Sequence, residues 1–396
     1  MAATTINTGV VDTSVPLSNR LKVDMHDPIR MLDPDVSQFS TMLSDPRLPS
    51  EKAGSYIVEW LEDRLIPRVL SLAATAASGD TTFTTGTNEG LYAKTGDIIR
   101  IPQTGEAVRV TGASASALTV VRAIGSVAAA TAATGALGGG TLIIVGGSNK
   151  QGGSLPTRLI TQQTRNYNYT QIVRNPYGFT RTAQQSNWWG GTTLLEWERE
   201  KKASEHKTDI ENTLFWGARS YTATSGPQHT AGGLFEYIST NKTNAAGTWS
   251  KSSMQTFLTS ALQYGSQNKV FFVSPLVNQV LSAYLSDNYV RADVGTTLFG
   301  AHVTALISGA FGNNVPVIVK RQWGAYGTAT SGQYQPAGVG FVVDLDSVAL
   351  APMQPSVRLS DRQANDADGV DEEYLAEFSF ICRQEPHHAL IYGVTG

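Results

Sequence analysis

Residues 188–217, WWGGTTLLEWEREKKASEHKTDIENTLFWG, constrain the fold more than any other part of the chain. A glycine pair ends any preceding helix there, and Thr192 and Thr193 are residue types that cap helix N-termini. Gly217 is typical of the position just after a helix. The segment therefore predicts one long helix over about 25 residues, delimited at both ends.

This predicted helix has two different halves. From Ala203 onward an apolar stripe recurs at spacings of three and four, which predicts that this half lies against a sheet. Residues 196–202 are nearly all charged, and each charge pair there contributes roughly 0.2–0.5 kcal/mol to an isolated helix. The expected pairs are Glu198–Lys202, Glu196–Arg199 and Lys201–Glu205. Two interpretations stay open for this half, a solvated face or a contact with a neighbouring copy of the chain.

The N-terminal part shows no such order. Residues 1–50 have few large apolar residues at a regular period, and five prolines interrupt any helix. We expect an arm that becomes ordered only against something else. In residues 54–67 two patterns compete, because Ile57, Trp60 and Leu61 fit a helix while Tyr56, Val58 and Trp60 alternate as on a strand. Propensity alone slightly favours the helix.

Residues 79–147 are predicted to form a separate β-rich insert. Short runs rich in β-forming residues, separated by glycines, are typical of a small barrel or sandwich. They lie at residues 81–84, 97–101, 107–110, 118–121 and 141–145, with a low-complexity Ala/Thr/Gly loop at 128–140. The following residues 158–181 should be extended and lead into the long helix. Arginines alternate there with tyrosines, which single-strand binders also use, but exposed strands are the simpler explanation.

The pattern changes to alternating helices and strands in residues 222–338. Ser252 or Ser253 is expected to cap a helix that ends before Gly265, residues 269–273 read as a buried strand, and Pro275 opens a second helix. Strands are expected at 302–308 and 315–320, followed by a polar loop at 324–338. Residues 341–350 and 374–383 return to strands, which we expect to meet in one sheet beside the long helix.

No constellation of residues predicts catalysis or a cofactor. Asp366 and Asp368 resemble part of a calcium loop, but non-ligating residues occupy its first and last positions, so an acidic surface turn is expected. Glu385, His387 and His388 do not make a metal site, since adjacent histidines on a strand point to opposite faces. We further expect His206 and Asp209 to lie on a helix surface, and Cys382 to be a buried, unreactive thiol.

Composition supports a structural role. Charged residues make up only 16% of the 396 residues and 41% are hydrophobic, which suits a protein that buries surface against other copies. A formal net charge of -3 argues against a chain whose main task is to grip nucleic acid. Without a leader pattern or an apolar run long enough to span a bilayer, we expect folding in a cytoplasm.

Several short motifs resemble those of one family of major capsid proteins of tailed bacteriophages. They are Glu-Trp-Leu-Glu-Asp at 59–63, Gly-Asp-Ile-Ile-Arg at 96–100 with Glu-Ala-Val-Arg-Val at 106–110, Asn-Tyr-Thr-Gln-Ile at 168–172, Asp-Ile-Glu at 209–211 and Gly-Gly-Leu at 232–234. The resemblance extends over residues 39–396. The motifs at 168–172 and 209–211 are the most specific.

The resemblance implies an α+β fold of the tailed-phage major capsid type. It implies an N-terminal arm at 1–50, an extension loop formed by 51–78 and 148–185, and the small β-barrel-like insert at 79–147. It further implies a peripheral domain with a long spine helix at 186–221 and 339–396, and an axial α/β domain at 222–338. On this view residues 54–67 form one side of the extension loop, which overrules the helix preference there.

The function implied is self-assembly into the pentamers and hexamers of an icosahedral phage head that encloses double-stranded DNA. The alternative is another virion component, such as a β-rich tail or decoration protein. Expected partners are further copies of the chain, a portal, and scaffold or decoration proteins, with non-specific contact to packaged DNA and none to a membrane. Contacts between subunits are expected at Trp60, Glu62, Asp63, Arg165, Arg174, Glu198, Arg199 and Lys202.

Overall fold

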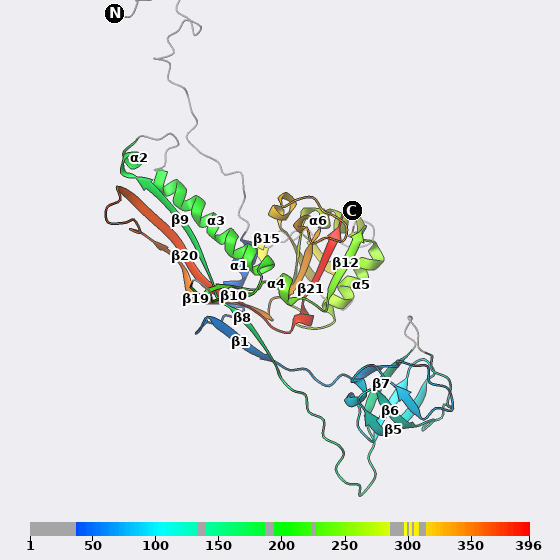
Figure 1. Cartoon of the computed structure of the whole chain (residues 1–396). Helices are drawn as coiled ribbons and strands as arrows, with labels where there is room; N and C mark the ends of the chain where they lie inside the picture. Colours follow the sequence, from blue (N-terminus) through cyan, green and yellow to red (C-terminus); the bar gives the residue numbers. More distant parts are fainter. Residues whose placement is uncertain are drawn as a thin grey trace, which may run out of the picture. The chain divides into compact units, whose positions relative to one another are not determined.

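The computed structural model describes residues 37–133, 140–186, 194–223, 226–285, 297–298, 301–302, 305–308 and 314–396 (Figure 1). The chain divides into two compact units. The core unit comprises Met1–Trp60 and Tyr167–Gly396, and the insert unit comprises Leu61–Asn166. Each unit has its own hydrophobic core, so the long excursion at 61–166 is a separate folding element rather than an extended loop alone.

A six-stranded mixed sheet forms the centre of the core unit, in the order β12-β21-β18-β13-β17-β16. Strand β13, Lys269–Val273, pairs parallel with β17 and antiparallel with β18. Its five residues are all buried, as expected for a continuous apolar run covered on both faces. The other strands are β12 (Lys242–Gly247), β16 (Ala305–Ser308), β17 (Asn314–Val319), β18 (Gly340–Asp344) and β21 (Ala389–Val394).

Different helices cover the two faces of this sheet. Phe271 and Val273 pack with helices α5, Lys251–Leu262, and α6, Pro275–Leu285. Val270 and Phe272 point the other way, towards the C-terminal end of helix α3, Leu194–Trp216. Figure 1 shows α5 and the end of α3 on opposite sides of the sheet. The alternation of side chains along one strand thus joins two hydrophobic clusters in a single unit.

A second sheet of three long strands lies along α3, in the order β19-β20-β9. Strand β9, Gln171–Thr180, pairs along ten residues of β20, Gly369–Cys382, and β20 pairs with β19, Val348–Leu359. Helix α3 packs along β9 and β20 (Figure 1). The predicted long helix is confirmed from residue 194 to 216, whereas its two expected threonine caps lie outside the described residues.

The strands near the C-terminus do not form one sheet, contrary to our expectation. Strands β18 and β21 belong to the six-stranded sheet, and only β19 and β20 lie beside α3. Strand β18 belongs to the central sheet because it pairs antiparallel with β13 and with β21, and both of its faces are covered there. A buried apolar strand is stabilised most where a sheet already has two covered faces.

Part of the predicted arm is a helix packed into the core unit. Helix α1, Gln38–Leu43, buries Phe39, Met42 and Leu43, with Phe39 and Met42 fully inaccessible. The expectation that no helix forms within residues 1–50 is therefore wrong at this point. Six residues are too few for a stable isolated helix, so α1 depends on packing that its local sequence does not reveal.

The insert unit is a small, nearly closed barrel. Six strands follow the order β2-β7-β4-β5-β6-β3, and an antiparallel bridge between Leu72 and Thr85 links the ends of the two edge strands. All five predicted β runs are confirmed by β3 (Thr82–Thr84), β4 (Asp97–Ile101), β5 (Glu106–Ser114), β6 (Ala117–Val121) and β7 (Thr141–Gly147). Strand β2, Val69–Ser71, was not predicted, and the 3-10 helix η1, Glu89–Tyr92, joins β3 to β4.

The competition at residues 54–67 is resolved in favour of the strand. Strand β1, Ile57–Glu62, pairs with β8, Thr164–Tyr169, so the resemblance was right and propensity was wrong. The remaining short elements are α2 (Arg181–Gln185), β10 (Ser220–Thr222), β11 (Gln228–Thr230), α4 (Leu234–Tyr237), β14 (Thr297–Leu298), β15 (Ala301–His302), η2 (Arg321–Ala325), η3 (Pro336–Gly338) and η4 (Glu385–His387).

The two predicted helices in residues 222–338 are confirmed, with one shift, whereas the strand predicted at 302–308 lies partly outside the described residues. Helix α5 begins after Ser250, whose hydroxyl accepts the Ser253 N–H at 3.2 Å, two residues before the first predicted cap. Helix α6 begins at Pro275 as predicted, and the Ser274 hydroxyl before it accepts the Val277 N–H at 3.2 Å. Within the described ranges, no helix combines the length and the apolar character that a bilayer crossing requires.

Candidate functional site

The charged half of α3 is tied to the sheet beside it. Arg199 donates to both carboxylate oxygens of Glu372 on β20, at 2.9 and 2.5 Å, and Tyr177 on β9 donates to the same carboxylate at 2.6 Å. The Arg199 hydrogen bonds lower the pKa of Glu372 to about 2. Burial and the neighbouring carboxylate raise the pKa of the Tyr177 hydroxyl. One face of the charged half is therefore bound within the subunit.

The remaining charges on this half pair along the helix, with partners that differ from those predicted. Lys202 pairs with Glu205 at 2.5 Å, and Lys201 lies 4.0 Å from Glu198. Because these side chains are partly exposed, each pair contributes little to stability. They leave a mixed-charge surface on α3.

One face of the C-terminal half of α3 is buried, including its histidine. His206 is 2% exposed, its Nδ1 lies 2.6 Å from the Asn175 side-chain oxygen, and its ring stacks on Tyr374. Burial lowers the pKa of His206, an effect that the Asp209 carboxylate opposes. The expectation of a helix-surface histidine is thus wrong. The sheet covers the position because His206 shares a stripe with Ile210 and Leu214.

Glu211 joins three parts of the core unit. Its two carboxylate oxygens accept the Phe39 and Ser40 N–H groups of α1 at 2.8 and 2.6 Å. The same carboxylate pairs with Lys320, which follows β17, and both side chains are buried. A carboxylate at a helix N-terminus satisfies donors that lack intrahelical partners. The Asp-Ile-Glu motif therefore attaches α1 and the central sheet to α3.

Asn168 makes a second connection of this kind. The buried Asn168 side chain donates to the carbonyls of Gly232 and Phe380 at 3.0 and 2.6 Å, and accepts the Gly232 N–H at 2.8 Å. Thr170 donates to Glu377 at 2.9 Å. These bonds join β8, β20 and the turn before α4. The Asn-Tyr-Thr-Gln-Ile and Gly-Gly-Leu motifs are thus two sides of one contact.

The predicted contact residues fall into two groups. Trp60 is 7% exposed and its ring lies 5.9 Å from that of Tyr237, so its side chain packs inside the subunit. Arg199 is partly exposed, and its guanidinium pairs with Glu372 of the same subunit. The others lie at least partly at the surface: Glu62 and Asp63 at the end of β1, Arg165 on β8, Arg174 on β9, and Glu198 and Lys202 on α3. Their contacts with a neighbouring copy stay a prediction.

Sequence reasoning missed the acidic partners on β20. Glu372 and Glu373 are each 3% exposed, and Glu373 pairs with Arg174 at 2.5 Å and Arg362 at 3.0 Å. Hydrogen bonds from Arg174 contribute most to a lowered pKa of Glu373. The sequence did contain a signal for these partners, namely two adjacent glutamates in a strand with alternating apolar residues. Because successive side chains of a strand point to opposite faces, one glutamate had to face the interior, where a carboxylate needs a cation as its partner.

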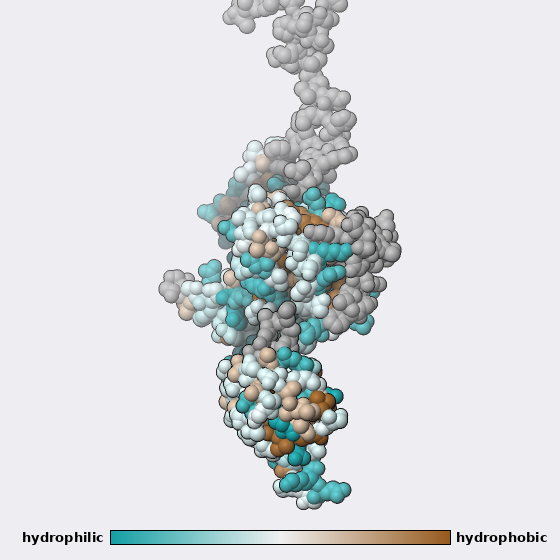
Figure 2. Space-filling view, turned by 90° about the vertical axis from the view of Figure 1, so that its right-hand side faces the viewer, coloured by the Kyte–Doolittle hydropathy of each residue, from teal (hydrophilic) through white to brown (hydrophobic). Residues whose placement is uncertain are grey.

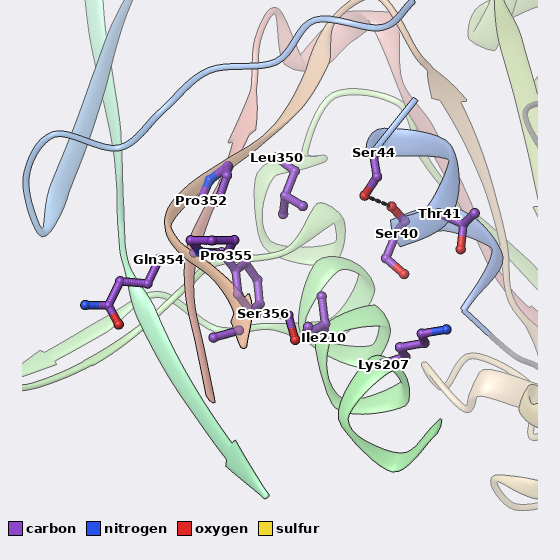
Figure 3. Close-up of a pocket in the computed structure, with 12 residues that line it drawn as sticks. Ser40, Thr41, Ser44, Lys207, Ile210, Leu350, Pro352, Gln354, Pro355 and Ser356 are labelled. Carbon is purple, nitrogen blue, oxygen red and sulfur yellow. Dashed lines mark hydrogen bonds between the residues drawn. The ribbon is translucent and has the colours of Figure 1, made fainter. Parts of the chain in front are cut away.

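A pocket of about 380 Å³ lies beside α1 and α3, against β19 and β20 (Figure 3). Its lining is mostly apolar, with Ile210, Leu350 and Pro352 among the residues shown, and Lys207 is the charged residue in it. The lining residues include no carboxylate, histidine or cysteine. The hydroxyl groups of Ser40, Thr41 and Ser44 in the lining donate to the backbone carbonyl oxygens of Ser37 and Ser40.

The histidines near the C-terminus occupy a different geometry from the one assumed. Residues Glu385–His387 form a 3-10 turn rather than a strand. His388 is fully buried, its Nδ1 accepts the Asp344 N–H at 3.2 Å, and burial lowers its pKa to about 4. Among the described residues no group of three or more His, Cys, Asp or Glu side chains could hold a metal ion. Cys382 is buried in β20, as expected.

Comparison with solved structures identifies the class of fold. The chain superposes on the capsid of an empty GTA particle with a TM-score of 0.50 and 9% identity, covering 97% of this chain and all of the other. A chain of a solved structure from Mycobacterium phage Bobi aligns less closely, with a TM-score of 0.49 and 9% identity, covering 98% and 100% of the two chains. The fold is that of the tailed-phage major capsid proteins, which confirms the predicted α+β class.

The family follows from a sequence model. The chain belongs to the SU10 major capsid protein family, whose model matches residues 2–395. A major capsid protein of Pseudomonas phage PaMx41 is 30% identical over 168 residues, covering 42% of this chain. The chain spans 39% of that relative's length. The protein is thus a structural component of a phage capsid and not an enzyme, and the alternative of a tail or decoration protein is set aside.

Proposed function

We propose that the protein self-assembles into the pentamers and hexamers of an icosahedral head that encloses double-stranded DNA. The observation that carries this proposal is the exposure of large aliphatic side chains on segments of the insert unit that lie outside its barrel. Leu61, Leu65, Leu155 and Ile160 are 63%, 93%, 74% and 90% exposed. Such side chains are normally covered, and a neighbouring copy would cover them.

The surface of the subunit supports the same proposal. Val69, Ile143 and Val145 on the strands of the insert unit are 53%, 39% and 67% exposed. Figure 2 shows hydrophobic residues gathered on one side of this unit, the lower body in that view. Exposed apolar patches on a soluble protein mark interaction surfaces. Assembly in the host cytoplasm would bring these patches together without a membrane or a cofactor.

We propose six residues for polar contacts between subunits: Glu62, Asp63, Arg165, Arg174, Glu198 and Lys202. The other two predicted residues, Trp60 and Arg199, would act by holding β1 and α3 in place. A portal, and scaffold or decoration proteins, would complete the head. Packaged DNA would touch the inner wall without specific recognition, since a chain of net charge -3 has no basic footprint of the kind that grips nucleic acid.

Electron microscopy of the full chain, expressed alone and purified, tests the proposal. We expect shells, rings or sheets of hexamers. Replacing Leu65 and Ile160 together by aspartate should abolish these assemblies while leaving circular dichroism unchanged, because both side chains are almost fully exposed in the subunit. Thr161→Asp on the same exposed segment is the control and should still assemble. A wild-type chain that stays a small monomer at high concentration would contradict the proposal.

A further inference from the structure

A second pocket, of about 440 Å³, lies within the insert unit, beside the start of β4. Its lining comes from three separate stretches of the chain, residues 66–68, 92–97 and 155–159. Each stretch contributes one cation, and these are Arg68, Lys94 and Arg158. A volume of this size suits a small molecule rather than a single ion. No local motif marks the pocket, because its parts lie far apart in the sequence.

The barrel fixes the backbone under two of the three cations. Lys94 begins a tight turn into β4, in which its carbonyl accepts the Asp97 N–H at 3.0 Å. The Asp97 carboxylate in turn accepts the Lys94 N–H at 3.0 Å. The Arg68 carbonyl accepts the Ile144 N–H of β7 at 2.8 Å. The positions from which Arg68 and Lys94 extend are therefore set by the fold of the insert unit.

The three cationic side chains have no anionic partner. Among the residues that the structure describes, none of the three forms an ion pair or a side-chain hydrogen bond. The carboxylate in the lining belongs to Asp97, which is 3% exposed and engaged by the backbone of Lys94. Three cations against one carboxylate leave the pocket with net positive charge. A ligand with more than one negative charge would offset their mutual repulsion.

The whole insert unit is positive in a chain that is negative. Residues 61–166 contain nine Lys or Arg and six Asp or Glu, whereas the rest of the chain contains 21 and 27. One of the six acids, Glu106, is already paired with Arg122 at 2.7 Å. The field of the unit therefore favours the approach of an anion to this pocket over its approach to the core unit.

The uncharged part of the lining suits a flat ring. Tyr92 packs against the core of the barrel and also lines the pocket, so its ring is supported from below. Ile66 and Leu159 are half-buried and add aliphatic surface. Small-molecule sites typically combine apolar walls with a few charged groups. An inorganic anion alone would leave the ring and the aliphatic side chains unused.

We propose that this pocket, called the cationic pocket below, binds one nucleotide, a nucleoside di- or triphosphate. Guanidinium groups bind phosphate oxygens through paired hydrogen bonds and an ammonium group binds them as a point charge, which assigns the phosphates to Arg68, Arg158 and Lys94. The base stacks on Tyr92. Since the cations come from three stretches, the bound nucleotide holds residues 155–159 against the barrel. This binding site goes beyond the proposed assembly and does not depend on it.

Isothermal titration calorimetry of the full chain tests the site, with ATP, inorganic triphosphate and adenosine as ligands. We expect ATP to bind at one molecule per subunit, and each of the other two to bind at least about tenfold more weakly. Replacing Arg68 and Arg158 together by alanine should weaken ATP binding by at least about tenfold. Tyr92→Leu keeps the apolar packing, so it should weaken the binding of ATP but not that of triphosphate.

A matched variant controls for diffuse charge. Replacing Arg100 and Arg109 together by alanine removes the same charge from exposed positions on β4 and β5, and ATP should bind this variant as it binds wild type. Equal losses in the two double variants would overturn the site, as would the absence of binding at about 1 mM ATP. Tighter binding of a single-stranded oligonucleotide than of ATP would overturn the assignment to a free nucleotide. Nucleotide binding and shell formation are measured separately, so failure of one is distinguishable from failure of the other.

Discussion

Buried polar side chains connect distant parts of the core unit. Asn168 bonds to the carbonyl of Phe380, and Glu211 bonds to the first turn of α1 and to Lys320. Both of these side chains have hydrogen-bond partners, which is the condition for placing an amide or a carboxylate in a protein interior. The family-like motifs are thus contacts that set the relative positions of strands and helices inside one subunit.

Removing Glu211 should destabilise the subunit strongly. Glu211→Ala removes the carboxylate that pairs with the buried Lys320 and accepts two N–H groups of α1, so the free energy of unfolding should fall by about 3–5 kcal/mol. Lys320→Met should cost less, because the carboxylate keeps its two N–H donors. Chemical denaturation of the unassembled subunit measures both. Glu200→Ala, an exposed position on α3, is the control, and equal losses for all three variants would contradict this account.

Gly233 should tolerate no side chain. A Cβ there would lie 2.5 Å from the Thr213 carbonyl oxygen and 2.8 Å from the Leu214 carbonyl oxygen at the end of α3. Backbone atoms cannot move aside easily, so Gly233→Ala should lower the free energy of unfolding by at least about 2 kcal/mol. Gly54→Ala is the matched control, since a Cβ at Gly54 meets nothing within 4 Å. Equal thermal melting of the two variants would exclude this close approach.

At the scale of elements, α3 is bound on two sides by different forces. Its C-terminal half lies in the hydrophobic cluster through Leu214 and Phe215, and its charged half is held to β20 by the Arg199–Glu372 pair. Burial of apolar side chains stabilises the C-terminal half of α3, whereas the attachment of the charged N-terminal half depends on the ionisation of Glu372. The attachment of the charged half should therefore respond to acid.

The pH dependence follows from the pKa of Glu372, which is lower in the folded subunit than in the unfolded chain. A lowered carboxyl pKa contributes stability above the unfolded value, and this contribution disappears as pH falls towards the folded value of about 2. Glu372→Gln should therefore destabilise the subunit at neutral pH, and the difference from wild type should shrink between about pH 5 and about pH 2. Urea denaturation across this range measures it. A difference that is constant with pH would rule out the ionised pair.

For the whole molecule, the two units have separate cores and opposite net charge. The core of the insert unit contains Phe83, Ile99 and Val108, and none of these belongs to the clusters of the core unit. Separate cores allow one unit to open without the other. The insert unit can therefore unfold locally while the core unit keeps its fold.

Phe83→Ala tests the independence of the units. Phe83 is fully buried, so its truncation should cost about 3–5 kcal/mol within the insert unit. Hydrogen exchange of the unassembled chain should then show faster exchange in β4 and β5 and unchanged exchange in β13 and β18. Thr82→Ala, exposed on the same strand, is the control. Loss of protection in both units together would mean that the chain unfolds as one.

Sequence alone determined the elements whose pattern is local. Residues 194–216 show helical charge spacing and are followed by Gly217, and residues 270–273 are a continuous apolar run. Glycines separate the five β-rich runs of the insert. Such signals depend on neighbours within a few residues, so they survive without knowledge of the fold. The resemblance added the strand at 57–62, where local propensity favoured a helix.

Tertiary structure decided what depends on distant partners. Helix α1 forms because Glu211 binds its N-terminus and because its apolar side chains pack into the hydrophobic cluster of the core unit. His206 is buried because β9 and β20 cover that face of α3. Strands β18 and β21 joined the central sheet through pairings with β13 and with each other. A strand's own residues specify that it will pair but not with which neighbour, because pairing energy is shared between segments far apart in the chain.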